Sequence, residues 1–282
     1  MHFSRAMRYL IVLLVVVGPT LTVVGVLSLP RAYVLMATTT STRDTGLLPY
    51  LLPQFTADTG IEVRYIAVGT GQALDAGRRG DVDVVMVHAP TNETQFMAAG
   101  HGLCRNILMY NTFVIVGPTG DPAGVHSATS SADAFARIFQ NQSRFESRAD
   151  GSGTYTKERE LWMAAGLNGS TFGPWYEKTN QGMGATLTIA NERSAYTLSD
   201  DGTWYARESS VPYLAVLYNR TEAILRNQYS VIPVNPVAHP GVRSEQAVEF
   251  ARWLVSARGQ SIIGAFQVNG HSIFTPNGVG VC

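Results

Sequence analysis

Three loops in this sequence combine small hydroxyl-bearing residues with glycine, and each stands between an apolar stretch and a helical pattern. They are Ala37–Thr42 (ATTTST), Val68–Gln72 (VGTGQ) and Arg148–Thr154 (RADGSGT). The start of a helix leaves N–H groups without partners inside the helix and carries about half a positive charge. Hydroxyl groups add donors, and glycine lets an ion approach the backbone. Each loop is therefore a candidate anion site.

Arg148 stands at the start of the third loop. Its guanidinium could bind an oxyanion through two parallel hydrogen bonds, which a lysine could not do. Taken singly, such a loop is more often a plain helix cap, and such an arginine is more often part of a surface ion pair. The three loops together are a stronger signal, because ligands of open α/β sheets gather at the carboxyl ends of strands. We interpret Asp44 and Asp150, which lie near the loops, as helix caps that also orient Arg148.

The hydrophobic pattern predicts the elements that would position these loops. Short apolar or alternating runs indicate strands, and amphipathic stretches between them indicate helices. The predicted order is strand 33–37, helix 47–55, strand 61–68, a short helix from 70 to about 80, and strand 82–87. Thr42 or Asp44 could cap the first helix. This βαβαβ order predicts a parallel sheet with right-handed crossovers and an α/β fold.

Two later strands, 107–116 and 229–234, enclose a block of about 110 residues, which is the size of a domain. We expect the strands to be two crossings between two lobes, so that the first lobe is discontinuous. The predicted first lobe is Ala32–Val116 plus Val231–Cys282, and the second is Gly117–Ser230. Further helices are predicted over 156–165, 186–193 and 245–256, and Ala257-Arg258-Gly259 is expected to end the last of them.

The first 31 residues are predicted to be an export segment. Arg5 and Arg8 precede Tyr9–Leu27, a run without charge. The segment is either a cleaved signal peptide or an uncleaved membrane anchor, since the run reaches the lower range of a spanning helix. The protein is therefore expected to be periplasmic or otherwise extracytoplasmic.

Composition excludes several classes of protein. Lysine plus arginine and aspartate plus glutamate each number 21, which argues against a nucleic-acid binder. Two cysteines, Cys104 and Cys282, are too few for a disulfide-dense scaffold; they could pair in an oxidising compartment or stay free. The histidines show no metal-binding spacing, so we predict no metal site and interpret them as surface and turn positions. The five histidines after the export segment are His88, His101, His126, His239 and His271.

Several stretches also resemble the TupA family of tungstate-binding proteins, substrate-binding components of ABC transporters that are related to phosphate-binding proteins. Matching segments include ATTTSTRDTGLLPYLLPQF, TGIEVRYIAVGTGQAL, GDVDVVMVHAP, the DGSGT loop after Arg148, WYEKTNQGMGATL and YSVIPVNP, in order from about Ala37 to Gln260. The resemblance implies a type II periplasmic-binding fold and an oxyanion clamped between the lobes. It assigns the following ligands: Thr40, Ser41, Gly69 and Thr70 from the first lobe, and Arg148, Ser152, Gly153 and Thr154 from the second.

One departure from phosphate binders is informative. They place an aspartate after the third strand to accept the proton of hydrogen phosphate, whereas this chain reads Val87-His88-Ala89-Pro90. An all-donor site suits an oxyanion that is fully ionised near neutral pH, because a carboxylate facing it would repel it. Tungstate, molybdate and sulfate are such ions, and the preference for tungstate comes from the resemblance. Gln181–Gly184 could add backbone donors, although a turn that serves packing is the favoured interpretation.

We therefore expect a binding protein, not an enzyme, that needs no cofactor. It would capture tungstate, with molybdate as second candidate, and deliver it as a monomer to an ABC permease driven by a separate ATPase. One alternative is a serine hydrolase or phosphotransferase that uses Ser152 in the same oxyanion cradle. The other alternative is a receptor for phosphate or sulfate.

Overall fold

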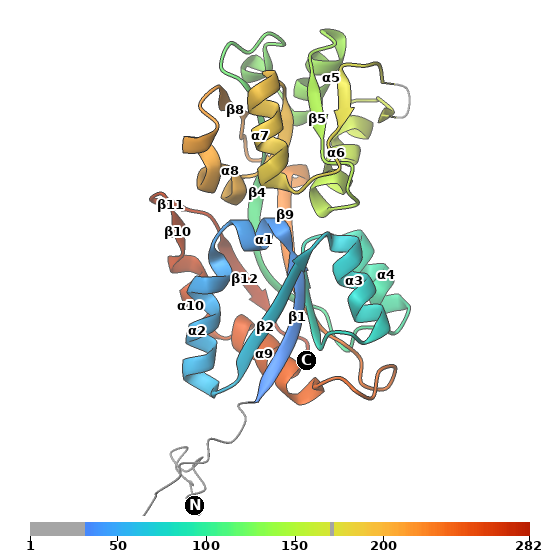
Figure 1. The fold of residues 1–282 in the computed structure, drawn as a ribbon, viewed down its shortest axis with the longest axis vertical. Coiled ribbons are helices and arrows are strands. Elements are labelled where there is room, and N and C mark those ends of the chain that lie inside the picture. The colour runs from blue at the N-terminus through green and yellow to red at the C-terminus, as the bar shows by residue number, and fades with distance from the viewer. Residues whose placement is uncertain (1–31, 170–171) are drawn as a thin grey trace, which may run out of the picture.

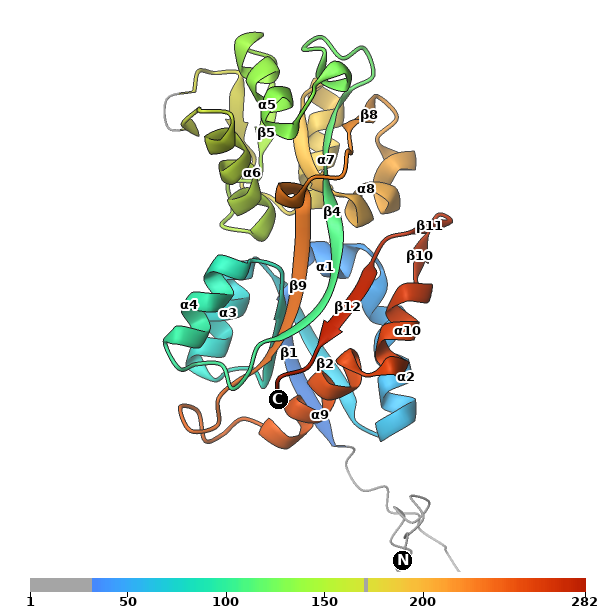
Figure 2. The same cartoon turned by 180° about the vertical axis from the view of Figure 1, so that it is seen from behind.

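Two lobes stacked along the long axis make up the described part of the chain (Figure 1). The computed structural model describes residues 32–169 and 172–282. The predicted export segment, residues 1–31, lies outside the described residues. Within those residues, no helix combines the length and apolar character that crossing a membrane requires. The two lobes are connected by β4 (Asn106–Pro118) and β9 (Arg226–Pro233), as both views show (Figures 1 and 2).

The first lobe is built on a sheet with the order β12-β4-β9-β3-β1-β2. Its main elements are β1 (Tyr33–Thr39), α1 (Thr40–Asp44), α2 (Leu47–Thr59), β2 (Glu62–Val68), α3 (Thr70–Arg79), β3 (Val84–Val87), α4 (Pro90–Ala98), α9 (Ser244–Val255), α10 (Ala257–Ala265) and β12 (Thr275–Val279). β1 pairs in parallel with both β2 and β3, which confirms the predicted βαβαβ unit. The three loops of this unit that follow β1, β2 and β3 therefore lie at one edge of the sheet.

Successive side chains of a strand point to opposite faces of the sheet, and helices cover the apolar side chains on both faces. Val34 and Met36 of β1 pack in a core with α2, α9 and α10, while Ala37 packs in a second core with α3 and α4. The buried stripe of α2 is the one that the sequence predicts, and it runs from Leu47 to Phe55. The sheet is thus held between two helical layers, which makes the loop edge a rigid platform.

The second lobe has two smaller cores. Its elements are η1 (Val125–Ser127), α5 (Ser131–Gln140), β5 (Phe145–Ser147), α6 (Gly153–Ala164), β6 (Tyr176–Lys178), α7 (Met183–Arg193), β7 (Thr197–Asp200), α8 (Asp201–Arg207), η3 (Glu208–Ser210), β8 (Leu214–Tyr218) and η4 (Ala223–Leu225). An aromatic cluster around Trp162 fills the core beside α5 and α6. Met183 and Leu187 of α7 fill the other core with Trp204 of α8. A short hairpin is formed by β10 (Gln267–Val268) and β11 (His271–Ser272).

The two crossing strands are shared by both lobes. β4 pairs antiparallel with β9 from Asn106 to Thr112, and its remaining residues pair with β7 and β8 of the second lobe. The predicted two-lobe α/β fold with two crossings and a discontinuous first lobe is therefore confirmed. The division after residues 116 and 230 stays a prediction. We propose a refinement inside the strands, since Phe113 already packs in a second-lobe core and Tyr229 in a first-lobe core.

Two local predictions are wrong. Neither Thr42 nor Asp44 caps α2, because Thr39 already caps the short helix α1 and α2 starts after Gly46, whose φ of 82° is left-handed. Ala257-Arg258-Gly259 does not end the helix predicted over 245–256. Helix α9 ends at Val255, and these three residues begin α10. Ser256 caps α10 by accepting the Gly259 N–H at 3.2 Å. Glycine fits there because a Cβ would lie 2.2 Å from the Trp253 carbonyl oxygen.

The two cysteines, whose pairing the sequence leaves open, form a disulfide between Cys104 and Cys282 with Cα atoms 5.5 Å apart. The bond ties the C-terminus to the start of β4. Asn106 strengthens the same junction, since its Oδ1 accepts the Val281 N–H at 2.9 Å. The last residues of the chain are thus held against the strand that leads into the second lobe.

Substitution Cys282→Ser should lower the free energy of unfolding by about 2–5 kcal/mol, because the disulfide restricts the unfolded chain over a separation of 178 residues. Chemical denaturation at pH 7 would measure this loss. The wild-type protein in reductant serves as control and should unfold like the variant. Equal unfolding midpoints with and without reductant would contradict the prediction.

Candidate functional site

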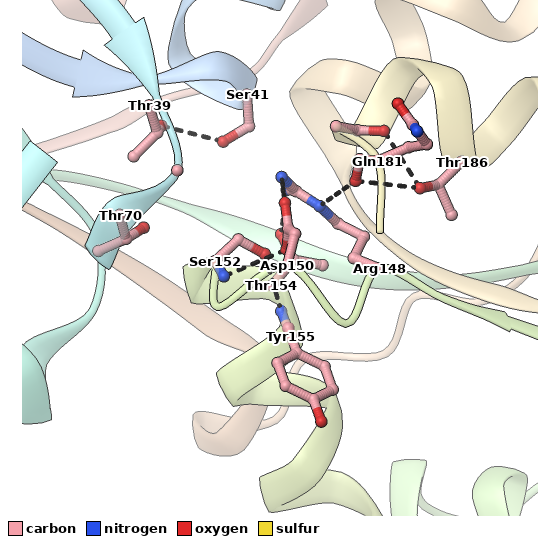
Figure 3. A network of polar contacts seen from close by, with 12 residues as sticks. Thr39, Ser41, Thr70, Arg148, Asp150, Ser152, Thr154, Tyr155, Gln181 and Thr186 are labelled. Carbon is pink, nitrogen blue, oxygen red and sulfur yellow. Dashed lines mark hydrogen bonds and ion pairs between the residues drawn. The ribbon is translucent and has the colours of Figure 1, made fainter. Parts of the chain in front are cut away.

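The three predicted loops meet where the lobes face each other (Figure 3). Thr70, at the start of α3 in the first lobe, accepts the backbone N–H of Gly153, at the start of α6, on its Oγ1 at 3.1 Å. Gly182, which precedes α7, lies against Thr40: a Cβ built on it would be 3.6 Å from Thr40 Oγ1. Helix starts of both lobes therefore converge on one place, as the sequence predicts.

Arg148 is the centre of the second-lobe half of the site. It follows β5, and only 2% of its surface is exposed. Nη2 lies 2.6 Å from Asp150 Oδ2, Nη1 donates to Thr154 Oγ1 at 3.3 Å and Nε donates to the Gln181 carbonyl at 3.4 Å. A guanidinium has five N–H groups, so two remain for a ligand. The side chain extends from the second lobe toward Ser41 (Figure 3).

The loop after Arg148 bends sharply to bring its donors to the same side. Ala149 and Gly151 have left-handed φ values of 46° and 70°, the first of which is unusual for a residue with a Cβ. Asp150 Oδ1 accepts the Ser152 N–H at 3.1 Å, and Ser152 Oγ accepts the Tyr155 N–H at 3.2 Å as the cap of α6. Asp150 thus orients Arg148, as expected, whereas Asp44 pairs with Arg43 instead.

The first-lobe half of the site is a cluster of buried hydroxyls at the end of β1. Thr39 Oγ1 lies 3.0 Å from Ser41 Oγ and 2.7 Å from Thr42 Oγ1. Ser41 and Thr70 were predicted site residues, while Thr39 and Thr42 were not singled out. The run Thr38–Thr42 pointed to this cluster. Which of its hydroxyls face inward depends on β1 ending at Thr39, a boundary that the run of threonines does not reveal.

His88 is the main residue that the sequence analysis misplaces. We interpreted it as a surface or turn position, yet it is 3% exposed and lies directly after β3. Its Nε2 is 3.1 Å from Ser41 Oγ and 3.2 Å from Thr39 Oγ1, and its ring stacks on Tyr229 with centroids 4.7 Å apart. Burial, together with the positive charge of Arg148, lowers the pKa of His88 to about 4. The imidazole is therefore neutral at pH 7.

A buried acid on α6, Glu158, holds the start of this loop in place. Glu158 of α6 accepts hydrogen bonds from Ser147 Oγ at 2.8 Å, Tyr176 Oη at 2.6 Å and Trp162 Nε1 at 3.2 Å. Ser147 directly precedes Arg148, so this contact fixes where the arginine leaves β5. Burial raises the pKa of Glu158 to about 7, and the three hydrogen bonds oppose that rise.

The arrangement can hold a small anion. The starts of α3, α6 and α7, the Arg148 guanidinium and the hydroxyl cluster all supply donors or positive charge. Asp150 is the one departure from the expected all-donor site among these loops, but both of its oxygens are already engaged by Arg148 and the Ser152 N–H. In the ranges 32–169 and 172–282 no cluster of histidine, cysteine, aspartate and glutamate suits a metal ion.

Ser152 does not have the surroundings of a nucleophile. Its Oγ is engaged as the cap of α6 by the Tyr155 N–H. His88 packs against the neighbouring Gly153, where a Cβ would lie 2.9 Å from Nδ1, but the hydrogen bonds of the ring go to Ser41, Thr39 and Asn227. A hydrolase would need a base that bonds the serine hydroxyl.

Comparisons with known proteins agree with this architecture. A family model described as a PBP superfamily domain matches residues 27–258. The chain is 42% identical over 251 residues to the tungstate-binding protein TupA of Peptoclostridium acidaminophilum, an alignment that covers 88% of this chain and 86% of that protein. Fold, strand order and inter-lobe site therefore define a binding protein of the periplasmic-binding-protein class.

Two solved structures narrow this class. The structure of the tungstate ABC transporter protein from Geobacter sulfurreducens is 44% identical, with a TM-score of 0.77, and covers 83% of this chain and 98% of its own. The tungstate-binding protein TupA from Desulfovibrio alaskensis G20 is 46% identical, with a TM-score of 0.76 over 87% of this chain and 99% of its own. The chain belongs to the TupA family. This membership confirms the expectation of a binding protein rather than an enzyme.

Protonation of Glu158 should make stability depend on pH. Burial raises its folded-state pKa to about 7 from the usual 4.5, so the folded protein retains a proton that the unfolded chain releases between these values. The contribution of Glu158 to the free energy of unfolding is therefore present at low pH and is lost as the pH rises to about 7. The isosteric Glu158→Gln should raise the free energy of unfolding at pH 8 by on the order of 2 kcal/mol, with little change at pH 4.5.

Denaturant unfolding at several pH values would test this expectation. Glu160→Gln is the matched control, because Glu160 lies on the same helix in an ion pair with Lys157 that is partly open to solvent. A stability difference between Glu158→Gln and wild type that stays constant from pH 4.5 to 8 would refute the assignment.

Proposed function

We propose that this protein captures tungstate, with molybdate as the second candidate ligand, and delivers it to the permease of an ABC transporter driven by a separate ATPase. The observation that carries the proposal is the buried Arg148, which forms an ion pair with Asp150 and faces hydroxyls of the opposite lobe. Related proteins of the TupA family bear the name tungstate-binding. A doubly charged anion would be held there by the guanidinium, the hydroxyls and the helix starts of both lobes.

The proposed ligand set draws on both lobes. The hydroxyls of Thr40, Ser41 and Thr70 and the backbone of Gly69 would bind from the first lobe. Arg148, Ser152, Gly153 and the Thr154 hydroxyl would bind from the second. The N–H groups of Ser152 and Gly153 donate to Asp150 Oδ1 and Thr70 Oγ1 and would exchange these partners for the ion. Supporting observations are the Thr70–Gly153 contact and the free N–H groups of the guanidinium. We add Thr39 to the proposed set, because its hydroxyl lies beside that of Ser41.

We also propose that the protein acts outside the cytoplasm as a monomer. Residues 1–31 would direct export, either as a cleaved signal peptide or as an anchor. The permease and the ATPase would be its partners, as for other substrate-binding components of ABC transporters. A cross-lobe site suits this role, because separation of the lobes would release the ion.

Calorimetric titration of the purified protein with tungstate, molybdate, sulfate and phosphate tests the proposal. We expect one-to-one binding that is tightest for tungstate and weak for phosphate, because hydrogen phosphate carries a proton and the end of β3 offers no carboxylate to accept it. Phosphate binding as tight as that of tungstate would contradict the assignment. Absence of binding by all four oxyanions would refute the proposal.

Substitution of Arg148 should weaken tungstate binding more than any surface change. Arg148→Lys keeps a charge beside Asp150 but loses the planar fork, and should reduce affinity by roughly 10- to 100-fold. Arg148→Ala should reduce it by more than about 100-fold, since charge-assisted hydrogen bonds contribute about 1.5–3 kcal/mol each.

The matched control is Arg144→Ala, which removes a half-exposed arginine of the same lobe whose carboxylate partner is Glu177. Its tungstate affinity should equal that of the wild type. Circular dichroism and thermal unfolding would verify that each variant is folded. Wild-type affinity in folded Arg148→Ala would remove the arginine from the site.

A further inference from the structure

His88 stands at the end of a buried chain of hydrogen bonds that crosses between the lobes. Its Nδ1 lies 2.9 Å from Asn227 Oδ1 of β9, and Asn227 Nδ2 donates to Asn111 Oδ1 of β4 at 2.8 Å. Asn111 Nδ2 in turn donates to Asp200 Oδ1 at 3.4 Å, at the end of β7. The chain therefore runs from the second lobe through both crossing strands to the proposed anion site.

Asp200 determines which group donates in each of these hydrogen bonds. Its Oδ1 also accepts the backbone N–H of Thr203 at 2.8 Å, so this oxygen is an acceptor even when the other oxygen carries a proton. Asn111 must then present its amide nitrogen to Asp200 and its oxygen to Asn227. For the same reason Asn227 presents its oxygen to His88. The nitrogen of His88 that faces Asn227, Nδ1, must carry a hydrogen.

This direction decides what the other ring nitrogen does. In a neutral imidazole with a hydrogen on Nδ1, Nε2 has a lone pair and can only accept a hydrogen bond. The groups within reach are the hydroxyls of Ser41 at 3.1 Å and Thr39 at 3.2 Å. One hydroxyl hydrogen is therefore drawn to His88 and is not available to an anion. A proton on Nε2 would reverse that bond and free the hydroxyl hydrogen.

We propose that His88 is a positioning residue that couples binding of a doubly charged oxyanion to uptake of one proton. The proton passes from solvent to the lone pair of Nε2, and the imidazolium then donates to the Ser41 or Thr39 oxygen. The released hydroxyl hydrogen turns to the anion, so that the site gains both a donor and a positive charge. The inference rests on the proposed function, because it requires an anion beside Ser41.

The charged surroundings of His88 support this coupling. Burial, reinforced by the neighbouring cation Arg148, lowers the pKa of His88 to about 4. Tyr229, stacked on the ring from β9, is neutral because burial raises its pKa well above the usual value. The acids nearby are Asp150, paired with Arg148, and Asp200 and Asp201 beyond Asn111, whose pKa values burial raises. A bound dianion would offset the field of Arg148 and raise the pKa of His88.

Proton uptake on binding makes the affinity for the anion depend on pH. Between the lower pKa of the free protein and the higher pKa of the complex, the complex holds more protons, so affinity increases as the pH falls. The slope approaches about a tenfold gain in affinity per pH unit where one proton is taken up. Above both pKa values the dependence on this group vanishes.

Calorimetric titration with tungstate at pH 6–8, in buffers of different ionisation enthalpy, measures the protons taken up. The wild type should take up a fraction of a proton that approaches one at the acidic end. His88→Gln, which cannot be protonated, should take up none and show a flat pH profile. His126→Gln is the control, since His126 is exposed and lies in the second lobe beside Asp121, and it should behave as wild type. Equal uptake by wild type and folded His88→Gln would overturn the inference.

Nitrogen NMR of the wild-type imidazoles tests the same point without a substitution. The anion-free protein at pH 7 should show His88 neutral with its hydrogen on Nδ1, and the tungstate complex should show hydrogens on both nitrogens. A hydrogen on Nε2 in the free protein, or a neutral ring in the complex at pH 6, would refute the inference. Tungstate binding without proton uptake removes this inference alone, whereas failure of every oxyanion to bind also removes the proposed function.

Discussion

A guanidinium enclosed between two lobes is the constraint that shapes the site. Water cannot solvate Arg148, which is 2% exposed, so its charge must be balanced by protein groups or by a ligand. Asp150 supplies a counter-charge and is held in place by the Ser152 N–H. The left-handed turn at Ala149 brings this carboxylate back to the arginine. The loop geometry, the helix cap and the ion pair thus together compensate the burial of the Arg148 charge.

The two crossing strands do more than connect the lobes. Because β4 pairs with β9 and then with β7 and β8, one strand takes part in the sheets of both lobes. Asn111 and Asn227 lie on these strands and continue the connection through their side chains. A buried amide must satisfy its donors and its acceptor, so the polar chain has a single allowed direction. The two crossing strands therefore determine which ring nitrogen of His88 carries a hydrogen, as well as the relative placement of the lobes.

The residue after β3 shows how one position can change the chemistry of an anion site. An aspartate there would accept a proton from the ligand, whereas His88 is neutral and shares hydroxyl hydrogens with Ser41 and Thr39. A neutral imidazole adds no repulsion toward a dianion. The same ring can take up a proton when negative charge arrives, which an amide in its place could not do.

The sequence by itself determined the local elements and the chemistry of the loops. Hydrophobic periodicity identified the βαβαβ unit and the two crossings, and the hydroxyl- and glycine-rich loops with Arg148 predicted an anion site, because these signals are carried by neighbouring residues. Tertiary structure alone decided the pairing of Cys104 with Cys282, the burial of His88 and the identity of Thr39 as an inward-facing hydroxyl. These features join residues far apart in the chain, such as His88 and Asn227. Their partners are set by strand pairing and lobe packing, and spacing along a single sequence contains no record of such contacts.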